Sequence, residues 1–209
     1  MTRLVSAIYN DAGPFLNINN VNSFEVSSNA DDLTTKDILL LHGGEDISPS
    51  LYNHPVSEYT GATKRPSRRD SIEWSMLQRA IELGIPIVGI CRGAQMLCAA
   101  AGGYLIQHVD NHSGDHIVET SEGDDVVTNS CHHQMMYPFD VDHELLMWTK
   151  YKRSGRHITG FEESINVPCE PEAVFFPKIK GFAPQWHPEW MSEQDPAVLL
   201  LLKQINERI

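Results

Sequence analysis

The feature that most constrains the fold is the segment GICRG at residues 89–93, which joins the apolar run IPIV to a stretch of small residues. Gly89 and Gly93 flank Cys91 at equal spacing. A strand that reverses abruptly into a helix needs room at such flanking positions, and glycine leaves that room because it has no side chain. A cysteine buried only for packing requires no such setting. The segment therefore predicts a strand, a sharp turn with Cys91 at its apex, and a helix.

The same turn predicts a reactive thiol. The unpaired amides at the start of a helix stabilise negative charge. We therefore expect Cys91 to favour the thiolate, which is the nucleophilic form. Taken alone, the pattern also fits an unreactive cysteine at the end of a core strand, so the choice depends on other motifs.

A second motif, QWHPEW at residues 185–190, supplies the groups that a thiol nucleophile needs. Pro188 favours an extended backbone at His187, so that His187 and Glu189 approach each other on one side. An isolated His-Pro-Glu segment fits a surface turn. Together with Cys91, however, it predicts a nucleophile, a general base and acid, and a carboxylate that orients the imidazole.

A third motif, LLLHGGED, ends another apolar run in two glycines. Gly43 and Gly44 allow the backbone to come close to a bound carbonyl group. The amides of Gly44 and of Arg92, which follows the nucleophile, are candidates for an oxyanion hole. By itself the motif also fits an ordinary turn.

Strand-like runs alternate with helix-like segments along the chain. The runs 37–41 and 85–90 are apolar throughout, as in strands of a parallel sheet covered on both faces. Between them, residues 70–83 carry apolar side chains at helical spacing. Residues 10–36 and 145–170 are weakly periodic and are expected to be loops. Further strands are expected at 3–9, 116–120, 125–130, 172–176 and 181–187, and further helices at 94–101 and 196–209.

Six segments in sequence order carry a family resemblance: LHGGEDISPSLY, RDSIEW, IPIVGICRGAQML, AAGGYLIQ, TNSCHHQ and QWHPEW. Across residues 37–190 the chain resembles the class I glutamine amidotransferase superfamily, and within it the γ-glutamyl hydrolase branch, which includes the γ-glutamyl-amine hydrolases. The resemblance implies an α/β fold. That fold is a flavodoxin-like sandwich with a mostly parallel sheet, helices on both faces and a nucleophile elbow. We expect residues 1–209 to form a single domain of this type.

The resemblance also implies roles for particular residues. The catalytic triad carries over to Cys91, His187 and Glu189, and the oxyanion hole to the backbone of Gly44 and Arg92. The substrate-binding residues that it implies are Gly43, Gln95, Ser130 and His132.

The implied reaction is cysteine-dependent hydrolysis of a γ-glutamyl amide bond through a γ-glutamyl thioester, with release of glutamate from a small-molecule substrate. No metal or organic cofactor is expected. One alternative is a glutaminase subunit that supplies ammonia to a synthetase. The synthetase would be a separate partner, because the chain carries no P-loop pattern of its own. The other is a non-catalytic relative that binds a ligand in the same pocket.

Composition excludes other classes of function. The chain has 16 Lys and Arg against 28 Asp and Glu, a formal net charge of −12, which disfavours binding to nucleic acid. No apolar run approaches the roughly 18 residues of a membrane span, and the N-terminal residues do not form a signal peptide. The four cysteines show no C-x-x-C pair, as is usual for reduced thiols. We therefore expect a cytoplasmic protein with no membrane partner.

Histidine spacing raises the question of a metal site. His108, His112 and His116 lie four residues apart, but Asp110 and Gly114 favour a loop over a continuous helix that would align them. A dedicated zinc site is therefore not expected. The charged run 64–70, KRPSRRD, is expected to be a solvated loop that leads into a helix.

Overall fold

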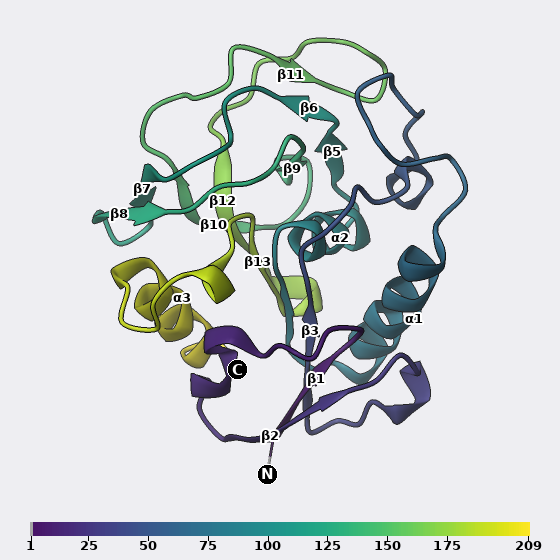
Figure 1. Ribbon diagram of the computed structural model, residues 1–209, viewed down its shortest axis with the longest axis vertical. Coiled ribbons are helices and arrows are strands. Elements are labelled where there is room, and N and C mark those ends of the chain that lie inside the picture. The colour runs from purple at the N-terminus through teal and green to yellow at the C-terminus, as the bar shows by residue number, and fades with distance from the viewer. Residues whose placement is uncertain (1) are drawn as a thin grey trace.

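The computed structural model describes residues 2–209, and its centre is a mixed sheet of nine strands (Figure 1). Neighbouring strands are parallel in one half of the sheet and antiparallel in the other. In spatial order, the parallel half contains β2 (Val21–Val26), β1 (Thr2–Ser6), β3 (Asp37–Leu41), β4 (Ile87–Gly89) and β13 (Gly181–Pro184). The antiparallel half continues with β12 (Pro171–Phe176), β10 (Glu144–Thr149), β7 (His116–Thr120) and β8 (Asp125–Thr128).

Helices cover both faces of the sheet. Helices α1 (Arg68–Leu83) and α2 (Arg92–Ala100) pack on one face, and α3 (Pro196–Asn206) packs on the other, so that α1 and α3 lie on opposite sides of β3 in Figure 1. Strand β3 is buried throughout and supplies alternate side chains to the two cores. Leu39 and Leu41 join the core under α1 and α2, whereas Ile38 and Leu40 join the core under α3. This explains its continuous apolar sequence.

Local sequence signals set the ends of α1. The hydroxyl of Ser67 accepts a hydrogen bond from the amide of Asp70, and the Asp70 carboxylate accepts one from the amide of Ser67. This capping box satisfies amides that the first turn leaves unpaired. Gly84 ends the helix in the left-handed conformation, with φ of 64°.

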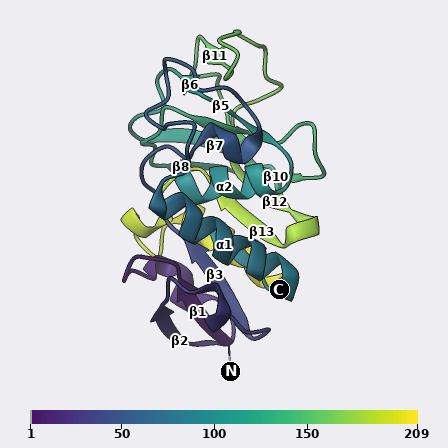
Figure 2. The same cartoon turned by 90° about the vertical axis from the view of Figure 1, so that its right-hand side faces the viewer.

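Smaller elements form the end of the molecule shown at the top of both views (Figures 1 and 2). Two-stranded sheets pair β5 (Tyr104–Ile106) with β9 (Met135–Tyr137) and β6 (His108–Val109) with β11 (His157–Ile158).

The 3-10 helices are η1 (Gly13–Asn17), η2 (Ala30–Asp32), η3 (Pro49–Tyr52), η4 (Pro177–Ile179) and η5 (Pro188–Trp190). No helix within residues 2–209 has the length and apolar character needed to cross a bilayer.

The predicted α/β fold is confirmed, with differences in detail that include the short strands β5, β6, β9 and β11. Four of the eight strand pairings are antiparallel, so the sheet is mixed rather than mostly parallel. Strands β2 and β10 also lie largely in regions that were expected to be loops. Strand β2 is an edge strand without a buried residue, and the pairing of β10 with β12 shifts register twice, so neither strand has a regular apolar pattern.

The parallel strands bring the predicted motifs to one edge of the sheet. The glycine pair follows β3, Cys91 follows β4, and His187 follows β13. These three strands are neighbours in the sheet. Because carboxyl ends of parallel strands meet at the same edge, the three motifs converge there.

Candidate active site

Cys91 occupies a strained turn between β4 and α2. Its backbone has φ of 49° and ψ of −99°, which is unusual for a residue with a side chain. A Cβ atom on Gly89 would overlap the carbonyl of Gly93, and one on Gly93 would overlap the carbonyl of Leu41. The turn therefore requires both glycines, as the sequence pattern indicates.

The environment of the thiol differs from the expectation of a ready thiolate. The side chain of Cys91 is buried, with 5% of the residue exposed. Burial raises the pKa of Cys91 to about 12, although the amide of Arg92 and the side chain of Gln185, 3.7 Å away, hydrogen-bond to the sulfur. Desolvation outweighs these favourable amides, because a buried anion loses its hydration. In this state Cys91 is a thiol and needs a base to become a nucleophile.

His187 and Glu189 are arranged as a base and its orienting carboxylate. The Nδ1 atom of His187 lies 2.7 Å from Oε1 of Glu189. A carboxylate only accepts, so Nδ1 carries the proton and Nε2 is left as the proton acceptor. The indole of Trp190 stacks on the imidazole with ring centroids 3.8 Å apart and planes 4° from parallel. The ring of His187 is thus fixed by one hydrogen bond and one stacking contact.

Asn129 holds the backbone of the base. Its side-chain amide donates to the carbonyl of His187 and accepts from the amide of His187, both at 2.8 Å. Asn129 lies within the TNSCHHQ motif, but sequence reasoning gave it no role. What indicates its role is the pair of hydrogen bonds to the N–H and the C=O of the same residue, and this pair can be recognised only in the folded structure.

Gly43 lies where the nucleophile and the base meet. A Cβ atom there would be 2.5 Å from Cε1 of His187 and 3.5 Å from Cβ of Cys91. Any side chain at this position would therefore intrude between the two catalytic candidates. The glycine leaves the space in which a substrate carbonyl has to sit.

Arg69 orients the peptide groups of the glycine pair. Its guanidinium donates to the carbonyls of His42 at 3.1 Å and Gly43 at 2.9 Å. In a trans peptide the N–H points away from the C=O, so the amide of Gly44 faces away from Arg69. Gly44 has φ of 151°, and a Cβ atom there would overlap the guanidinium. The predicted oxyanion donor is thus held in one orientation by an arginine.

Arg69 belongs to the run 64–70, which was expected to be a solvated loop. Helix α1 instead begins at Arg68, and the guanidinium of Arg69 is fixed by Glu73 at 3.0 Å and Glu45 at 2.9 Å. Its side chain is only 10% exposed. The charged run therefore supplies a support for the glycine loop.

The side chain of Arg92, the second predicted oxyanion residue, points into the interior. It forms buried ion pairs with Asp70, at 2.5 Å, and with Glu73. Its amide opens α2 beside the Cys91 sulfur. Its backbone and side chain therefore have separate tasks, because the ion pairs link α2 to α1.

A pocket of about 350 Å³ collects these groups. The predicted residues Gly43, Gly44, Cys91, His187 and Glu189 all line it. Further lining residues without a predicted role are Tyr9, Asp11, His42, Cys131 and Trp190. Tyr9 ends the run 3–9 that was expected to be a strand, and Asp11 lies in the weakly periodic region 10–36. No sequence motif indicated a role for either residue.

Three predicted substrate-binding residues are not among the residues that line this pocket. The side-chain Nε2 of Gln95 donates to the carbonyl of Gln134, and the hydroxyl of Ser130 donates to the carbonyl of His112. His132 Nδ1 lies 2.8 Å from the carbonyl of Gln134. Their polar atoms instead hold the segment 129–134 beside the pocket.

Two of the three evenly spaced histidines come together. His112 and His116 gather around the buried carboxylate of Glu172, whereas His108 pairs with Asp110 nearer the surface. Glu172 is 56 residues from His116, so the spacing of histidines gave no indication of it. Among residues 2–209, this trio is the group of His, Cys, Asp or Glu side chains whose ligand atoms lie close enough together to share a metal ion.

Comparison with known proteins assigns the chain to a family. The family described as Peptidase C26 matches residues 6–140, more than half of the chain. The chain belongs to the peptidase C26 family. The resemblance to class I glutamine amidotransferases, including their γ-glutamyl hydrolase branch, is thereby confirmed.

Relatives in other organisms match parts of the chain. A Mycobacterium tuberculosis protein, named provisionally as a glutamine amidotransferase, is 40% identical over 82 residues, which are 36% of this chain and 25% of that protein. The γ-glutamyl-γ-aminobutyrate hydrolase of Escherichia coli O157:H7 is 24% identical over 169 residues, 71% of this chain and 62% of that protein. The chain thus matches from a quarter to under two thirds of these relatives.

Solved structures agree on the fold. A Thermoplasma acidophilum protein, described provisionally as one subunit of a GMP synthase, superposes with a TM-score of 0.64 and covers 99% of this chain and 93% of that chain. The two sequences are 15% identical. The likeness therefore concerns the fold.

Proposed function

We propose that the chain is a cysteine hydrolase that cleaves the γ-glutamyl amide bond of a small molecule and releases glutamate. The observation that carries this proposal is the convergence of Cys91, His187 and the Gly43–Gly44 backbone on one pocket. Family membership supports the reaction class, and the name of the Escherichia coli relative supports a γ-glutamyl amine as substrate.

The reaction begins with proton transfer from the Cys91 thiol to Nε2 of His187. The sulfur then attacks the γ-carbonyl carbon, and the oxyanion is held by the amides of Gly44 and Arg92. The imidazolium of His187 next donates its proton to the departing amine, which leaves a γ-glutamyl thioester on Cys91. Water activated by His187 hydrolyses this thioester to glutamate and a free thiol.

Glu189 keeps the base effective throughout this cycle. Its carboxylate holds Nδ1 protonated, which leaves Nε2 available, and it stabilises the imidazolium that forms in each half-reaction. The high pKa of the Cys91 thiol makes this coupling necessary, since the resting thiol does not ionise by itself at neutral pH. The roles proposed here need no metal or organic cofactor.

The cytoplasm suits this chemistry. All four cysteines are free, and Cys131 is exposed beside the nucleophile in the same pocket. An oxidising compartment would expose these thiols to disulfide formation. We therefore propose that the enzyme works in the reducing cytoplasm.

The decisive experiment measures glutamate release from glutamine and from a panel of γ-glutamyl amines. We expect the wild-type chain to release glutamate from at least one γ-glutamyl amine faster than from glutamine. Cys91→Ser should abolish release, and Cys98→Ser is a matched control in α2, away from the pocket. Equal turnover by the wild type and Cys91→Ser would overturn the mechanism.

A second candidate function is that of a glutaminase component that passes ammonia to a separate synthetase. It is favoured by the likeness to a structure described as part of a GMP synthase. Such a component should act on glutamine weakly when alone and faster in complex with its partner. A non-catalytic binding protein would release glutamate from no substrate and would show no preferential alkylation of Cys91.

A further inference from the structure

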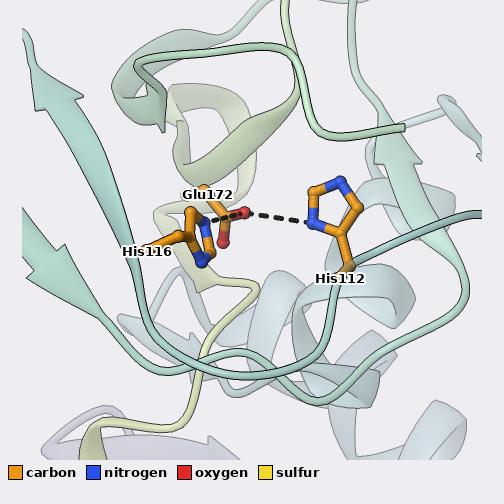
Figure 3. Close-up of side chains that lie close together, drawn as sticks. All are labelled: His112, His116 and Glu172. Atoms are coloured by element: carbon orange, nitrogen blue, oxygen red, sulfur yellow. Dashed lines mark hydrogen bonds and ion pairs between the residues drawn. The ribbon is translucent and has the colours of Figure 1, made fainter. Parts of the chain in front are cut away.

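Outside the active-site pocket, a buried cluster joins three segments of the chain. His112 lies in the loop between β6 and β7, His116 opens β7, and Glu172 lies in β12. Their exposed fractions are 2%, 7% and 0%. Figure 3 shows the carboxylate of Glu172 between the two imidazoles, with a nitrogen of each ring turned toward it.

The distances in this cluster suit a shared cation. Oε1 of Glu172 lies 2.9 Å from Nε2 of His116 and 3.5 Å from Nδ1 of His112, and the three ligand atoms lie within 4.8 Å of one another. A tetrahedral zinc ion with bonds of roughly 2.0–2.2 Å holds its ligand atoms roughly 3.3–3.6 Å apart. Binding would replace the 2.9 Å hydrogen bond between His116 and Glu172 by coordination of both groups to the ion, and ligand atoms that now lie up to 4.8 Å apart would move closer together.

The cluster also contains polar atoms that protein groups leave unsatisfied. Among residues 2–209, neither ring nitrogen of His112 has a partner within hydrogen-bond geometry, and Oε2 of Glu172 has none. Buried polar atoms without partners typically cost about 1–3 kcal/mol each. A cation bound to Nδ1 of His112 would give this nitrogen a closer partner than Oε1 of Glu172, which lies 3.5 Å away.

Negative charge is concentrated at the same place. Glu170, two residues before Glu172, is also buried, with 1% of its surface exposed. The Glu172 carboxylate is fully buried and lies against the rings of His112 and His116. A divalent ion would balance the two buried carboxylates.

We propose that Nδ1 of His112, Nε2 of His116 and Oε1 of Glu172 bind a divalent transition-metal ion of the zinc class. Imidazole nitrogens with a carboxylate oxygen form a donor set that zinc accepts, whereas calcium and magnesium prefer oxygen donors.

A supporting carboxylate stands behind one ligand. Oε2 of Glu170 lies 3.4 Å from Nε2 of His112, on the side of the ring opposite the ion. Glu170 is itself fixed by the backbone amides of Arg153 and Ser154, both at 2.8 Å. A carboxylate that receives the second ring N–H of a ligating histidine orients the ring and increases its basicity.

A hollow at the surface lies beside His112. His112 and His132 both line it, and their rings are 4.6 Å apart. Nε2 of His132 is buried without a partner among the described residues. His132 is therefore available as a further donor, or water can complete the coordination.

The ion would help to hold in place the segment that positions the backbone of His187. The carbonyl of His112 accepts hydrogen bonds from the hydroxyl of Ser130 at 2.9 Å and from the amide of His132 at 3.0 Å. Asn129, next along the chain, holds both backbone polar groups of His187. Fixing His112 to β7 and β12 therefore fixes the segment that positions the base.

Metal content after dialysis tests the proposal. The untagged chain is stripped with a chelator, dialysed against buffered zinc and measured by elemental analysis. We expect one zinc per wild-type chain, and at least tenfold weaker binding by His112→Gln, His116→Gln and Glu172→Gln. His143→Gln is the matched control. His143 directly precedes β10, at the end of this strand that lies away from Glu172, so the variant should bind zinc like the wild type.

Two further measurements use the wild-type chain and do not depend on the folding of a variant. Zinc should raise the melting temperature, and chelator should reverse this shift. Cobalt should give visible bands of a nitrogen- and oxygen-bound tetrahedral ion, without a strong sulfur-to-cobalt band in the near ultraviolet. A strong sulfur band, or zinc loss in Cys91→Ser rather than in the histidine variants, would place the ion at the active-site thiols and overturn the proposal. Wild-type chain that retains no zinc would overturn it as well.

Discussion

Arg69 shows how one side chain can set the geometry of backbone catalysis. Its planar guanidinium binds two consecutive carbonyls, those of His42 and Gly43, while Glu73 and Glu45 hold it in place. Lysine carries the same charge but lacks the fork that reaches both carbonyls. The oxyanion donor at Gly44 therefore depends on the shape of Arg69 as well as on its charge.

At this residue we predict that Arg69→Lys lowers kcat about tenfold or more and changes KM less. The loss of one oxyanion donor typically costs a factor of about 10²–10³ in kcat, and here the donor is loosened rather than removed. Steady-state kinetics with the γ-glutamyl amine that the wild type hydrolyses fastest measures the changes in kcat and in KM separately. Arg79→Lys, on the same helix and paired with Glu82, is the control. A change confined to KM would show that Arg69 binds substrate instead.

At the level of elements, an ion pair connects β1 to β3. Arg3 donates to both carboxylate oxygens of Asp37, at 3.0 and 2.8 Å, and the two residues face each other in the register of these strands. Burial alone would raise the pKa of Asp37, but hydrogen bonds from Arg3 and Thr34 outweigh it and hold the pKa below the usual 3.8. The ionised form of Asp37 is therefore the one that stabilises the fold.

A carboxylate with a lowered pKa stabilises the folded state above its unfolded pKa and loses that contribution as the pH falls through its folded pKa. We predict that Asp37→Asn lowers the free energy of unfolding by about 1–3 kcal/mol at pH 7. As the pH falls below about 4, the free energy of unfolding should also decrease less in the variant than in the wild type. Urea unfolding between pH 7 and pH 3 measures both effects, with Glu25→Gln as the control at an exposed partner of Arg3. Wild-type stability in Asp37→Asn at pH 7 would refute the assignment.

At the scale of the whole molecule, the two cores share the strands of one sheet. Strand β3 contributes side chains to both of them, and β12 and β13 do the same through Val174 and Ala173, and through Ala183 and Phe182. Neither core can lose its packing while the other keeps intact strands. We therefore propose that residues 1–209 form one domain.

One domain of this kind should unfold in one cooperative step. We predict that far-ultraviolet circular dichroism and tryptophan fluorescence give coincident urea transitions. The fluorescence reports on both halves, because Trp74 lies in α1 and Trp148 lies in β10. Two separated transitions would show that the parallel and antiparallel halves of the sheet are independent units.

The sequence by itself determined the features that depend on neighbours along the chain. The turn at Cys91, the buried strand at 37–41, the strand at 116–120 and the C-terminal helix follow from glycine spacing and apolar periodicity, which report local conformation and burial. The pairing of His187 with Glu189 was also predictable, because only Pro188 separates them. The expectation that Cys91 favours the thiolate was not met, since local motifs do not reveal how deeply a residue is buried.

Only the tertiary structure decided which distant residues meet. Arg69 reaches the glycine pair from 26 residues away, Asn129 reaches His187 from 58, and Glu172 reaches His116 from 56. The contact of Arg69 depends on the packing of α1 against β3, whereas the contacts of Asn129 and Glu172 depend on the antiparallel extension of the sheet through β12, β10, β7 and β8. A side chain's local pattern carries no record of its distant partners, so the supports of the site and the buried histidine cluster emerge only when the sheet is assembled.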